Sequence, residues 1–362
     1  MERKNLMKRV VVCGLVVAMT VAAWAQNGQV VHERLPFAKG ADISWITQIE
    51  DNGKYELVDD EGKGIDGFEM LRQCGMNMVR LRVWVNPRPD RRSGRIWCDT
   101  KDLVAKAVRA KAAGMRVMVD FHYSNWWADP SKQHVPEEWK NCDIDALCDS
   151  VEAHTAEVLQ SLLSAGVEPT WIQVGNETPT GFMKPLGDAV EHPENFARLF
   201  RRGHETCKRI CPKALTMVHI DNGFMLDRTE FILDILQRYG VDYDLLGWSL
   251  YPAMNWLATP PVIDLNWRQK ADQCIANVDS VFQKYGKESM IVEIGIPQDH
   301  EQLCSEVIEY MIEKAPEHLL GLVYWEPITT PDFGYTMGAL KHYGGNKYAA
   351  NAGMKAFRTP SR

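Results

Sequence analysis

The sequence predicts a single (β/α)8 TIM barrel, an α/β fold in which eight parallel strands alternate with helices and close into a cylinder. Eight segments rich in β-branched and aromatic residues recur along the 362-residue chain, at intervals of roughly 30 to 55 residues. Helical patterns separate seven of these segments from the next. Polar residues stand where the strand segments end, and in this fold those ends meet at one face.

The strand segments consist of apolar residues, several of them alternating with polar ones. In segment 77–85, NMVRLRVWV, Arg80, Arg82 and Trp84 share one face because side chains alternate along a strand. Two arginines on the same face of an apolar strand need anions or an exit to solvent, which indicates a charged barrel interior. In chain order, strands are expected at 38–46, 77–85, 116–124, 171–177, 214–222, 245–252, 289–297 and 320–327.

Helices are expected where apolar residues recur every three to four positions. Glycine follows three of these patterns, at Gly75, Gly114 and Gly166, as is typical of a helix C-terminus. The charged, glycine-containing stretch 52–67 and the long stretch 125–141 are expected to be loops. In chain order, helices are expected at 68–74, 103–113, 144–165, 196–211, 229–239, 267–285 and 302–315.

The first 25 residues are expected to be a signal peptide. Basic residues precede the apolar run 10–23, and Ala23 and Ala25 supply the small side chains that signal peptidase recognises. The run is shorter than the roughly 20 residues that a membrane span needs. Cys13 follows only three apolar residues of the run, so lipidation is the weaker interpretation. Cleavage would leave a lead-in at 26–37 and a catalytic domain at 38–362, exported to the periplasm or the cell exterior and free of the membrane.

Charge limits the class of partner. Without residues 1–25 the chain has 37 basic and 47 acidic residues, a net charge of −10. This balance argues against nucleic acid and against a strongly acidic polymer as partner. A neutral polysaccharide fits better, and the protein is expected to act as a monomer.

The cysteines and histidines give no sign of a metal or redox centre, so no cofactor and no metal are expected. Eight cysteines follow residue 25, without any C-x-x-C pair, and neither H-x-H on a strand nor H-E-x-x-H occurs. A chain of this size does not require disulfides. Cys207 and Cys211 fit a buried helical stripe, whereas a bridge between Cys142 and Cys148 is an open alternative.

Two glutamates are the candidate catalytic residues. Glu177 ends the segment WIQVGNE, and Glu293 lies within the otherwise apolar segment SMIVEIGIP. An ionised side chain inside an apolar strand is costly unless it has partners or a task. A pair of carboxyl groups is the equipment for hydrolysing a glycosidic bond. A glutamate at a strand end is common by itself, so Glu293 is what raises Glu177 above a structural role.

The two glutamates are expected to differ in protonation. Glu293 acts as the ionised nucleophile, held by Arg80 and the Tyr251 hydroxyl, whereas burial and nearby negative charge keep Glu177 protonated as the acid. Aromatic residues in loop 125–141 serve as sugar platforms or pack into the loop itself. The candidates for substrate binding are Asn176 for a sugar 2-hydroxyl, Trp325 beneath the ring, Arg80, Tyr251, and His122 and His219, for which structural hydrogen bonds are an equal alternative.

With these residues the chain resembles the endo-β-1,4-galactanases of glycoside hydrolase family 53. The matching blocks are GADIS, GMNMVRLRVWVNP, DFHYSNWWADPSKQ, WIQVGNE, MVHIDNG, LGWSLYP and VYWEP, which extend from Gly40 to about Pro327. The resemblance implies a secreted enzyme that hydrolyses the β-1,4-galactan side chains of pectin with retention, with Glu177 as acid/base and Glu293 as nucleophile. Some relatives bind a structural calcium ion, and no ligand loop for one is evident here.

The chain departs from the family pattern at several positions. Leu250, Ile294 and Ile296 replace polar or aromatic residues, and the loop 178–185, TPTGFMKP, lacks an expected tryptophan. These positions are expected to line the groove and to affect substrate preference. Two alternatives therefore stay open: a related barrel glycosidase that acts on mannan or glucan, and a glycan-binding barrel without turnover, against which the intact glutamate pair argues.

Overall fold

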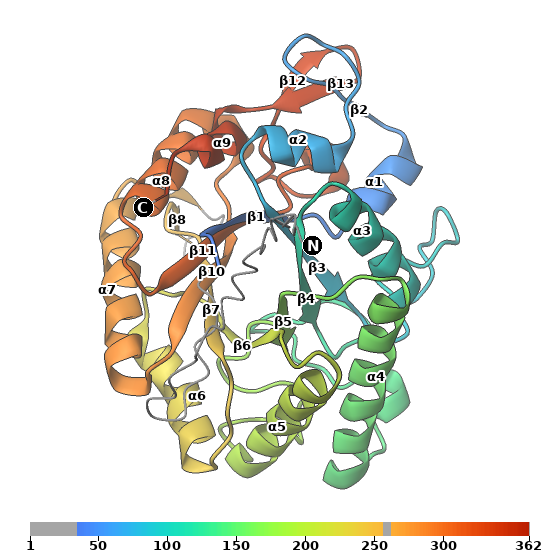
Figure 1. Cartoon of the computed structure of the whole chain (residues 1–362), viewed down its shortest axis with the longest axis vertical. Helices are drawn as coiled ribbons and strands as arrows, with labels where there is room; N and C mark the ends of the chain where they lie inside the picture. Colours follow the sequence, from blue (N-terminus) through green and yellow to red (C-terminus); the bar gives the residue numbers. More distant parts are fainter. Residues whose placement is uncertain (1–34, 256–261, 362) are drawn as a thin grey trace, which may run out of the picture. The chain divides into compact units, whose positions relative to one another are not determined.

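Eight parallel strands close into a barrel around which the helices are arranged, as the sequence predicts (Figure 1). The order around the barrel is β1, β3, β4, β5, β6, β7, β10 and β11, and β11 pairs with β1 to close it. This computed structural model describes residues 35–255 and 262–361. The barrel strands are β1 (Ala38–Asp42), β3 (Met78–Val83), β4 (Arg116–Phe121), β5 (Trp171–Val174), β6 (Leu215–Ile220), β7 (Leu245–Leu250), β10 (Glu288–Ile294) and β11 (Leu319–Trp325).

Helices connect successive barrel strands. Aspartates cap the N-termini of three helices. The side chains of Asp66, Asp99 and Asp143 each accept a hydrogen bond from a backbone N–H of the first turn. Gly286 ends α7 in the left-handed conformation, with φ of 67°, which glycine adopts without strain. The helices are α1 (Ile46–Asn52), α2 (Gly67–Gln73), α3 (Thr100–Ala112), α4 (Ile144–Ser164), α5 (Pro193–Ile210), α6 (Leu226–Arg238), α7 (Trp267–Tyr285), α8 (Glu301–Glu313) and α9 (Ala352–Lys355).

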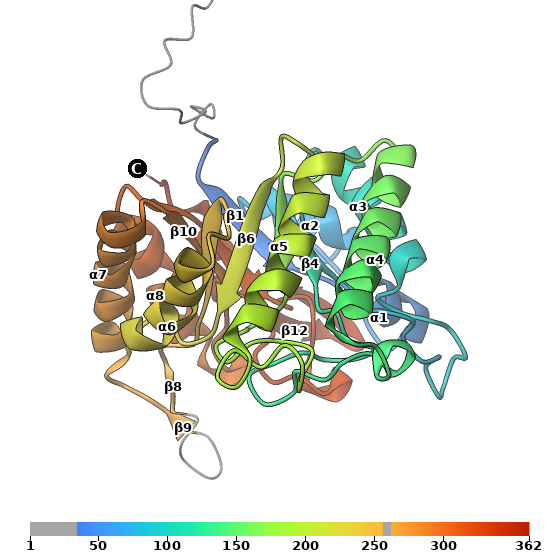
Figure 2. The same ribbon diagram turned by 90° about the horizontal axis from the view of Figure 1, so that it is seen from below.

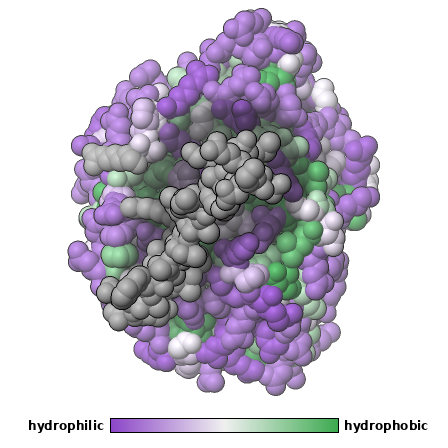
Figure 3. All heavy atoms as spheres, viewed as in Figure 1, coloured by the Kyte–Doolittle hydropathy of each residue, from purple (hydrophilic) through white to green (hydrophobic). Residues whose placement is uncertain are grey.

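The strands separate two hydrophobic layers. Their outward side chains pack with the helices in the larger cluster, which contains Val79, Leu81 and Val83 as the alternation in β3 predicts. On the face turned to the viewer in Figure 3, hydrophilic residues dominate the periphery. A smaller cluster fills the barrel interior and is made of Ala38, Met78, Met118, Trp171, Met217, Leu245, Met290, Val292 and Val323.

A layer of polar side chains lies above this inner cluster, two residues further along the strands. The parallel register pairs Asp42 with Arg80, Arg82 with Asp120, and Asp120 with Gln173. All five side chains are fully buried. The charged barrel interior expected from the two arginines of β3 is therefore present.

A β-bulge in β10 turns Glu293 into the barrel. Met290 and Val292 belong to the inner cluster and Ile291 to the outer one, so strict alternation would point Glu293 outward. The register of β10 against β7 shifts between Ile291 and Glu293, which leaves Val292 as the extra residue. Glu293 thereby pairs with Ser249 and reaches the polar layer.

The first strand is shorter than expected, and α1 was not predicted. β1 ends at Asp42 instead of residue 46, because the backbone N–H and the hydroxyl of Ser44 both donate to Asp42 Oδ1, at 3.0 and 2.6 Å. The chain turns there and enters α1 at Ile46. The sequence pattern carries no signal for a turn that depends on a buried carboxylate.

Short elements complete the fold. A three-stranded sheet joins β2 (Glu56–Leu57), within the expected loop 52–67, to the hairpin β12 (Leu340–Gly344) and β13 (Lys347–Ala350). The pair β8 (Met254–Asn255) and β9 (Val262–Ile263) projects from one end of the barrel (Figure 2). Single turns of 3₁₀ helix are η1 (Glu137–Trp139), η2 (Gln298–His300), η3 (Pro331–Phe333) and η4 (Ala356–Arg358).

Several sequence predictions concern residues outside this description or stay untested. The signal peptide at 1–25 and most of the lead-in at 26–37 lie outside the described residues.

Across residues 35–255 and 262–361, none of the helices combines the length and apolarity that crossing a bilayer requires. The eight cysteines after residue 25 are free thiols, so the alternative of a Cys142–Cys148 bridge is wrong.

Candidate active site

Arg80 stands at the centre of the candidate site. Its side chain projects from β3 into the barrel and is fully buried. The neighbouring carboxylates keep its pKa above the ordinary value although burial lowers it, so the guanidinium stays charged. Its partners are Asp42 Oδ2 at 2.8 Å, Asp120 Oδ2 at 2.9 Å, Glu293 Oε1 at 3.0 Å, Asn176 Oδ1 at 2.7 Å and Gln173 Oε1 at 3.2 Å.

Glu293 is held by the two groups that the sequence suggested. Arg80 Nη1 lies 3.0 Å from Oε1, and the Tyr251 hydroxyl donates to Oε2 at 3.1 Å. Burial raises the pKa of Glu293 to about 7, and the arginine and the tyrosine both lower it. Because these two contacts stabilise the charged form, Glu293 is the glutamate of the candidate catalytic pair that ionises first.

Glu177 follows β5 in a conformation that is rare for a residue with a side chain. Its φ is 43°, and such strain persists where the surroundings hold it in place. Its backbone N–H donates to His219 Nδ1 at 3.2 Å, and its carbonyl accepts from Gln133 Nε2 at 2.8 Å. These two hydrogen bonds fix the backbone N–H and carbonyl of Glu177, and the fixed backbone sets the direction in which the side chain leaves the strand end.

The surroundings of Glu177 favour the protonated form. Burial raises its pKa well above the ordinary range, and the negative charges of Glu293 and Asp221 raise it further. A hydrogen bond from Ser249 and the positive charge of Arg80 oppose this effect without cancelling it. At a pH between the pKa of Glu293 and that of Glu177, the glutamate pair therefore holds one carboxylate and one carboxylic acid, which is the protonation state that glycosidic-bond cleavage requires.

The two candidate histidines are fixed by hydrogen bonds within the protein. His122 Nδ1 accepts from the Ala128 N–H at 3.0 Å, so Nε2 carries the proton that it donates to Asp120 at 3.0 Å. Burial lowers the pKa of His219 well below the ordinary value, which keeps this ring neutral. His219 Nε2 lies 3.0 Å from Ser249 Oγ. Both histidines therefore make the structural hydrogen bonds that the sequence left open, and a contact of either ring with substrate stays a prediction.

The Asn176 amide is also engaged by the protein. Its Oδ1 accepts from Arg80 Nη2 at 2.7 Å, and its Nδ2 donates to the Ala128 carbonyl at 2.7 Å. One amide hydrogen of Nδ2 is left over by these contacts, since a primary amide carries two. The contact with a sugar 2-hydroxyl stays a prediction for that hydrogen.

Trp325 belongs to a wall of aromatic rings at the mouth of the barrel. The rings of Trp45 and Trp127 lie 5.4 and 5.7 Å from it, and the ring of Tyr335 lies 4.6 Å away at 78°. The Arg82 guanidinium stacks beneath this wall, 4.3 Å from the Trp127 ring. Stacking of a sugar ring on Trp325 stays a prediction.

The loop 125–141 uses its three tryptophans in different ways. Trp126 is 56 % exposed and lies on the ring of Trp84, with centroids 4.8 Å apart. Trp127 joins the wall around Trp325. Trp139 packs against the hydrophobic core and His154. Both expectations for this loop, a sugar platform and internal packing, therefore find a tryptophan that fits.

Several residues of the site were not singled out by the sequence. Asp42 and Asp120 are acids within apolar strands, the same signal that singled out Glu293, and they were overlooked. Gln133 binds the carbonyls of both Asn176 and Glu177, but nothing in a polar loop distinguishes it. Trp45 and Tyr335 approach Trp325 from distant segments, so only the fold reveals them.

The departures from the family pattern do not lie where they were expected. Leu250, Ile294 and Ile296 are fully buried in the outer cluster, packed with the helices, and do not line the groove. The same alternation that turns Ser249 inward turns Leu250 outward. Phe182, in the loop 178–185, packs against Tyr123 in that layer as well.

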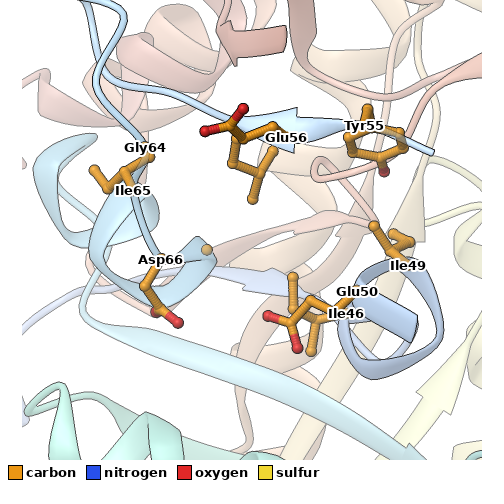
Figure 4. A pocket seen from close by; sticks show the side chains of 10 residues that line it. Ile46, Ile49, Glu50, Tyr55, Glu56, Gly64, Ile65 and Asp66 are labelled. Atoms are coloured by element: carbon orange, nitrogen blue, oxygen red, sulfur yellow. The ribbon is translucent and has the colours of Figure 1, made fainter. Parts of the chain in front are cut away.

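A pocket of about 350 Å³ lies apart from the glutamates, between α1, β2 and α2 (Figure 4). Ile46, Ile49 and Tyr55 give it apolar surface, and Glu50 and Asp66 stand at its edge. Both carboxylates are already paired with Arg109, at 2.6 and 2.7 Å.

Among residues 35–255 and 262–361, no group of three or more metal-ligating side chains is arranged to hold an ion.

Comparison with known proteins relates this geometry to one family. The model of glycosyl hydrolase family 53 matches residues 38–303. The endo-β-1,4-galactanase of Bacillus subtilis is 32 % identical over 261 residues, which cover 71 % of this chain and 56 % of that protein. A protein of Neosartorya fischeri described as a probable arabinogalactan endo-β-1,4-galactanase A is 31 % identical over 320 residues, which cover 80 % of this chain and 83 % of the relative.

The fold agrees with these relatives. A solved structure from a study of two fungal β-1,4-galactanases matches with a TM-score of 0.74 and 27 % identity, covering 90 % of this chain and 99 % of the other. The chain spans little more than half the length of the Bacillus subtilis relative. It is a glycoside hydrolase with a (β/α)8 barrel. The chain belongs to glycosyl hydrolase family 53.

Proposed function

We propose that the protein is an endo-acting hydrolase of β-1,4-galactosidic bonds in the galactan or arabinogalactan side chains of pectin. The observation that carries this proposal is the pairing of Glu293, held by Arg80 and Tyr251, with the more basic Glu177. The relatives described as galactanases support the choice of substrate. The net charge of −10 without residues 1–25 suits a neutral chain better than an acidic one.

The proposed reaction proceeds with retention in two steps. Glu293 attacks the anomeric carbon while Glu177 protonates the departing glycosidic oxygen, and a galactosyl-enzyme ester forms on Glu293. Glu177, now ionised, takes a proton from water, and the water oxygen displaces the Glu293 carboxylate from the sugar. Trp325 stacks on the sugar at the cleavage point, and Asn176 donates to its 2-hydroxyl.

Incubation with β-1,4-galactan, mannan and β-glucan tests the substrate. Short galacto-oligosaccharides released from galactan alone are the expected products, and cleavage only of mannan or glucan would overturn the choice of galactan. Proton NMR at early times should show the β-anomer of the new reducing end first. An α-anomer as the first product would exclude retention.

Two variants test the assignment of roles. Glu177→Ala with azide and an activated aryl β-galactoside should form a β-galactosyl azide, because the nucleophile is intact, the phenolate leaves without a proton donor, and azide needs no base. Glu293→Ala with azide and an activated α-galactosyl fluoride should form the same β-azide by single displacement, with no turnover of galactan. Full galactanase activity in the Glu293 variant would refute the mechanism.

Location and assembly are part of the proposal. The predicted signal peptide at 1–25 supports export to the periplasm or the cell exterior, where galactan is accessible. We propose that the mature protein acts as a monomer, without a metal or another cofactor and without binding nucleic acid or membrane. Amino-terminal sequencing of the exported protein should begin after Ala25, and light scattering should give the mass of one chain.

A further inference from the structure

The segment between β11 and β12 brings a tyrosine to the candidate nucleophile. After Glu326 the chain passes through η3 and returns along the rim of the barrel. The Gln298 N–H donates to the Thr336 carbonyl at 2.9 Å, and the Tyr324 hydroxyl donates to the Met337 carbonyl at 3.0 Å. The backbone around Tyr335 is therefore held in place by residues that flank the ends of β10 and β11.

The Tyr335 side chain is confined on several sides. Its ring lies 4.6 Å from the Trp325 ring and 6.0 Å from the Trp45 ring. Its hydroxyl lies over Gly295, because a Cβ on this glycine would stand 3.1 Å from the hydroxyl oxygen and 3.1 Å from Tyr251 Cε1. The Tyr335 hydroxyl and the Tyr251 ring thus share the small space that Gly295 leaves, two residues after Glu293.

The Tyr335 hydroxyl is buried, and within the described part of the chain it makes no hydrogen bond of normal geometry. A buried hydroxyl without a partner is destabilising, so such a group beside Tyr251 indicates a hydrogen bond that a small movement of the side chains completes. Burial and the charge of Glu293 raise the pKa of Tyr335, and the Tyr251 hydroxyl lowers it. Tyr335 therefore remains a neutral phenol with a proton to donate towards these two groups.

We propose that Tyr335 is a positioning residue for the nucleophile, acting through Tyr251: its hydroxyl donates to the Tyr251 oxygen and thereby strengthens the bond from Tyr251 to Glu293. A phenol oxygen carries two lone pairs, so Tyr251 can donate its proton to Glu293 Oε2 and also accept from another hydroxyl. A hydroxyl that accepts a hydrogen bond becomes a better donor. The inference rests on the proposed role of Glu293 as nucleophile.

Any test must account for the other charges around Glu293. All of these groups except Tyr251 act on the carboxylate independently of Tyr335, so the titration compares variants that leave every one of them in place. They are Arg80 on β3, Asp42 on β1, Asp120 on β4, Glu177 after β5 and Tyr251 after β7.

Tyr335→Phe removes only the hydroxyl and keeps the ring against Trp325. Titration of protein labelled with ¹³C at the glutamate carboxyl carbons follows Glu293 directly, with Glu293→Gln used to assign its signal. We expect the Glu293 pKa to rise by roughly half a unit in the Tyr335 variant. Tyr343→Phe, a change at a 45 % exposed tyrosine on β12, is the matched control and should leave it unchanged. An unchanged Glu293 pKa in Tyr335→Phe would overturn the proposal.

A double-mutant cycle tests the route through Tyr251. Tyr335→Phe should lower kcat three- to tenfold and change KM less than twofold, with a Tm that does not fall. In the Tyr251→Phe background the same change should have no further effect on kcat or on the Glu293 signal. Additive losses would show that Tyr335 acts independently of Tyr251. Because the NMR titration needs no substrate, failure to cleave galactan would sink the proposed function and leave this inference testable.

Discussion

Arg80 Nη1 lies 3.0 Å from Glu293 Oε1, and the same guanidinium binds Asp42 and Asp120 at 2.8 and 2.9 Å. One buried cation is therefore shared among three carboxylates. Two of them are permanent partners on neighbouring strands, and the third is the candidate nucleophile. Burial raises the pKa of Glu293 to about 7, and the negative charges of Asp120 and Asp42 oppose the lowering effect of Arg80.

Arg80→Lys keeps a positive charge but loses the planar fork that binds several acceptors at once. We expect kcat on galactan to fall about 100-fold, because the nucleophile loses its fixed orientation and part of its charge stabilisation. Arg80→Met removes the charge and should also lower the free energy of unfolding by about 3–5 kcal/mol, since it leaves buried carboxylates uncompensated. Steady-state kinetics and urea denaturation measure the two effects. A lysine variant with wild-type kcat would contradict this account.

The pH dependence of kcat/KM should be bell-shaped. Activity requires Glu293 ionised and Glu177 protonated, so it rises as pH passes the Glu293 pKa of about 7 and falls as Glu177 loses its proton at higher pH. The two limbs belong to the coupled pair. Glu177→Gln, assayed on an aryl galactoside that needs no acid, should keep the acidic limb and lose the alkaline one. An alkaline limb that survives this change would mean that another group supplies the proton.

The Glu177 carboxyl should also make stability depend on pH. Its pKa is higher in the folded protein than in the unfolded chain, so its contribution is greatest below the unfolded pKa and is lost as pH rises towards the folded pKa. Glu177→Gln cannot ionise and should gain a few degrees in Tm over the wild type at pH 8, but little at pH 4. Calorimetry at both values measures the difference. An equal or larger gain at pH 4 would contradict the raised pKa.

Trp126 is expected to be a platform for a sugar unit away from the cleavage point. Its ring is 56 % exposed and rests on Trp84. Trp126→Ala should raise KM for galactan roughly fivefold, which corresponds to the loss of about 1 kcal/mol of stacking, and should leave kcat on an aryl galactoside unchanged. Tyr343→Ala, at another exposed aromatic residue, is the control. Equal effects of both variants would argue against a sugar-binding role.

The residue pattern alone was sufficient to predict the barrel strands and the charged face of β3. The alternation in NMVRLRVWV placed Arg80 and Arg82 inside, since a strand between a core and a helix layer permits only that arrangement. It also identified Glu177 and Glu293 as an exceptional pair, because acids are rare in such strands unless they are used. Their catalytic roles stay predictions that the variants above will test.

Two expectations failed around the end of β10. The family pattern misplaced Leu250, Ile294 and Ile296 in the groove, and alternation offered no reason why Glu293 should face inward. The bulge at Val292 decides that orientation, and a bulge depends on the register between β10 and β7. Likewise, Tyr335 reaches Trp325 only because the rim segment folds back over the mouth of the barrel.

The sequence by itself determined which residue types are available, which strand carries each of them and therefore the class of chemistry, because period-two patterning and strand-end acids are local properties. Only the tertiary structure decided which carboxylates share Arg80 with Glu293 and which side chains hold the two glutamates in place from behind. Those outcomes depend on distances between side chains on strands far apart in the chain. Electrostatic effects in a buried site vary steeply with such distances, and no local pattern encodes them.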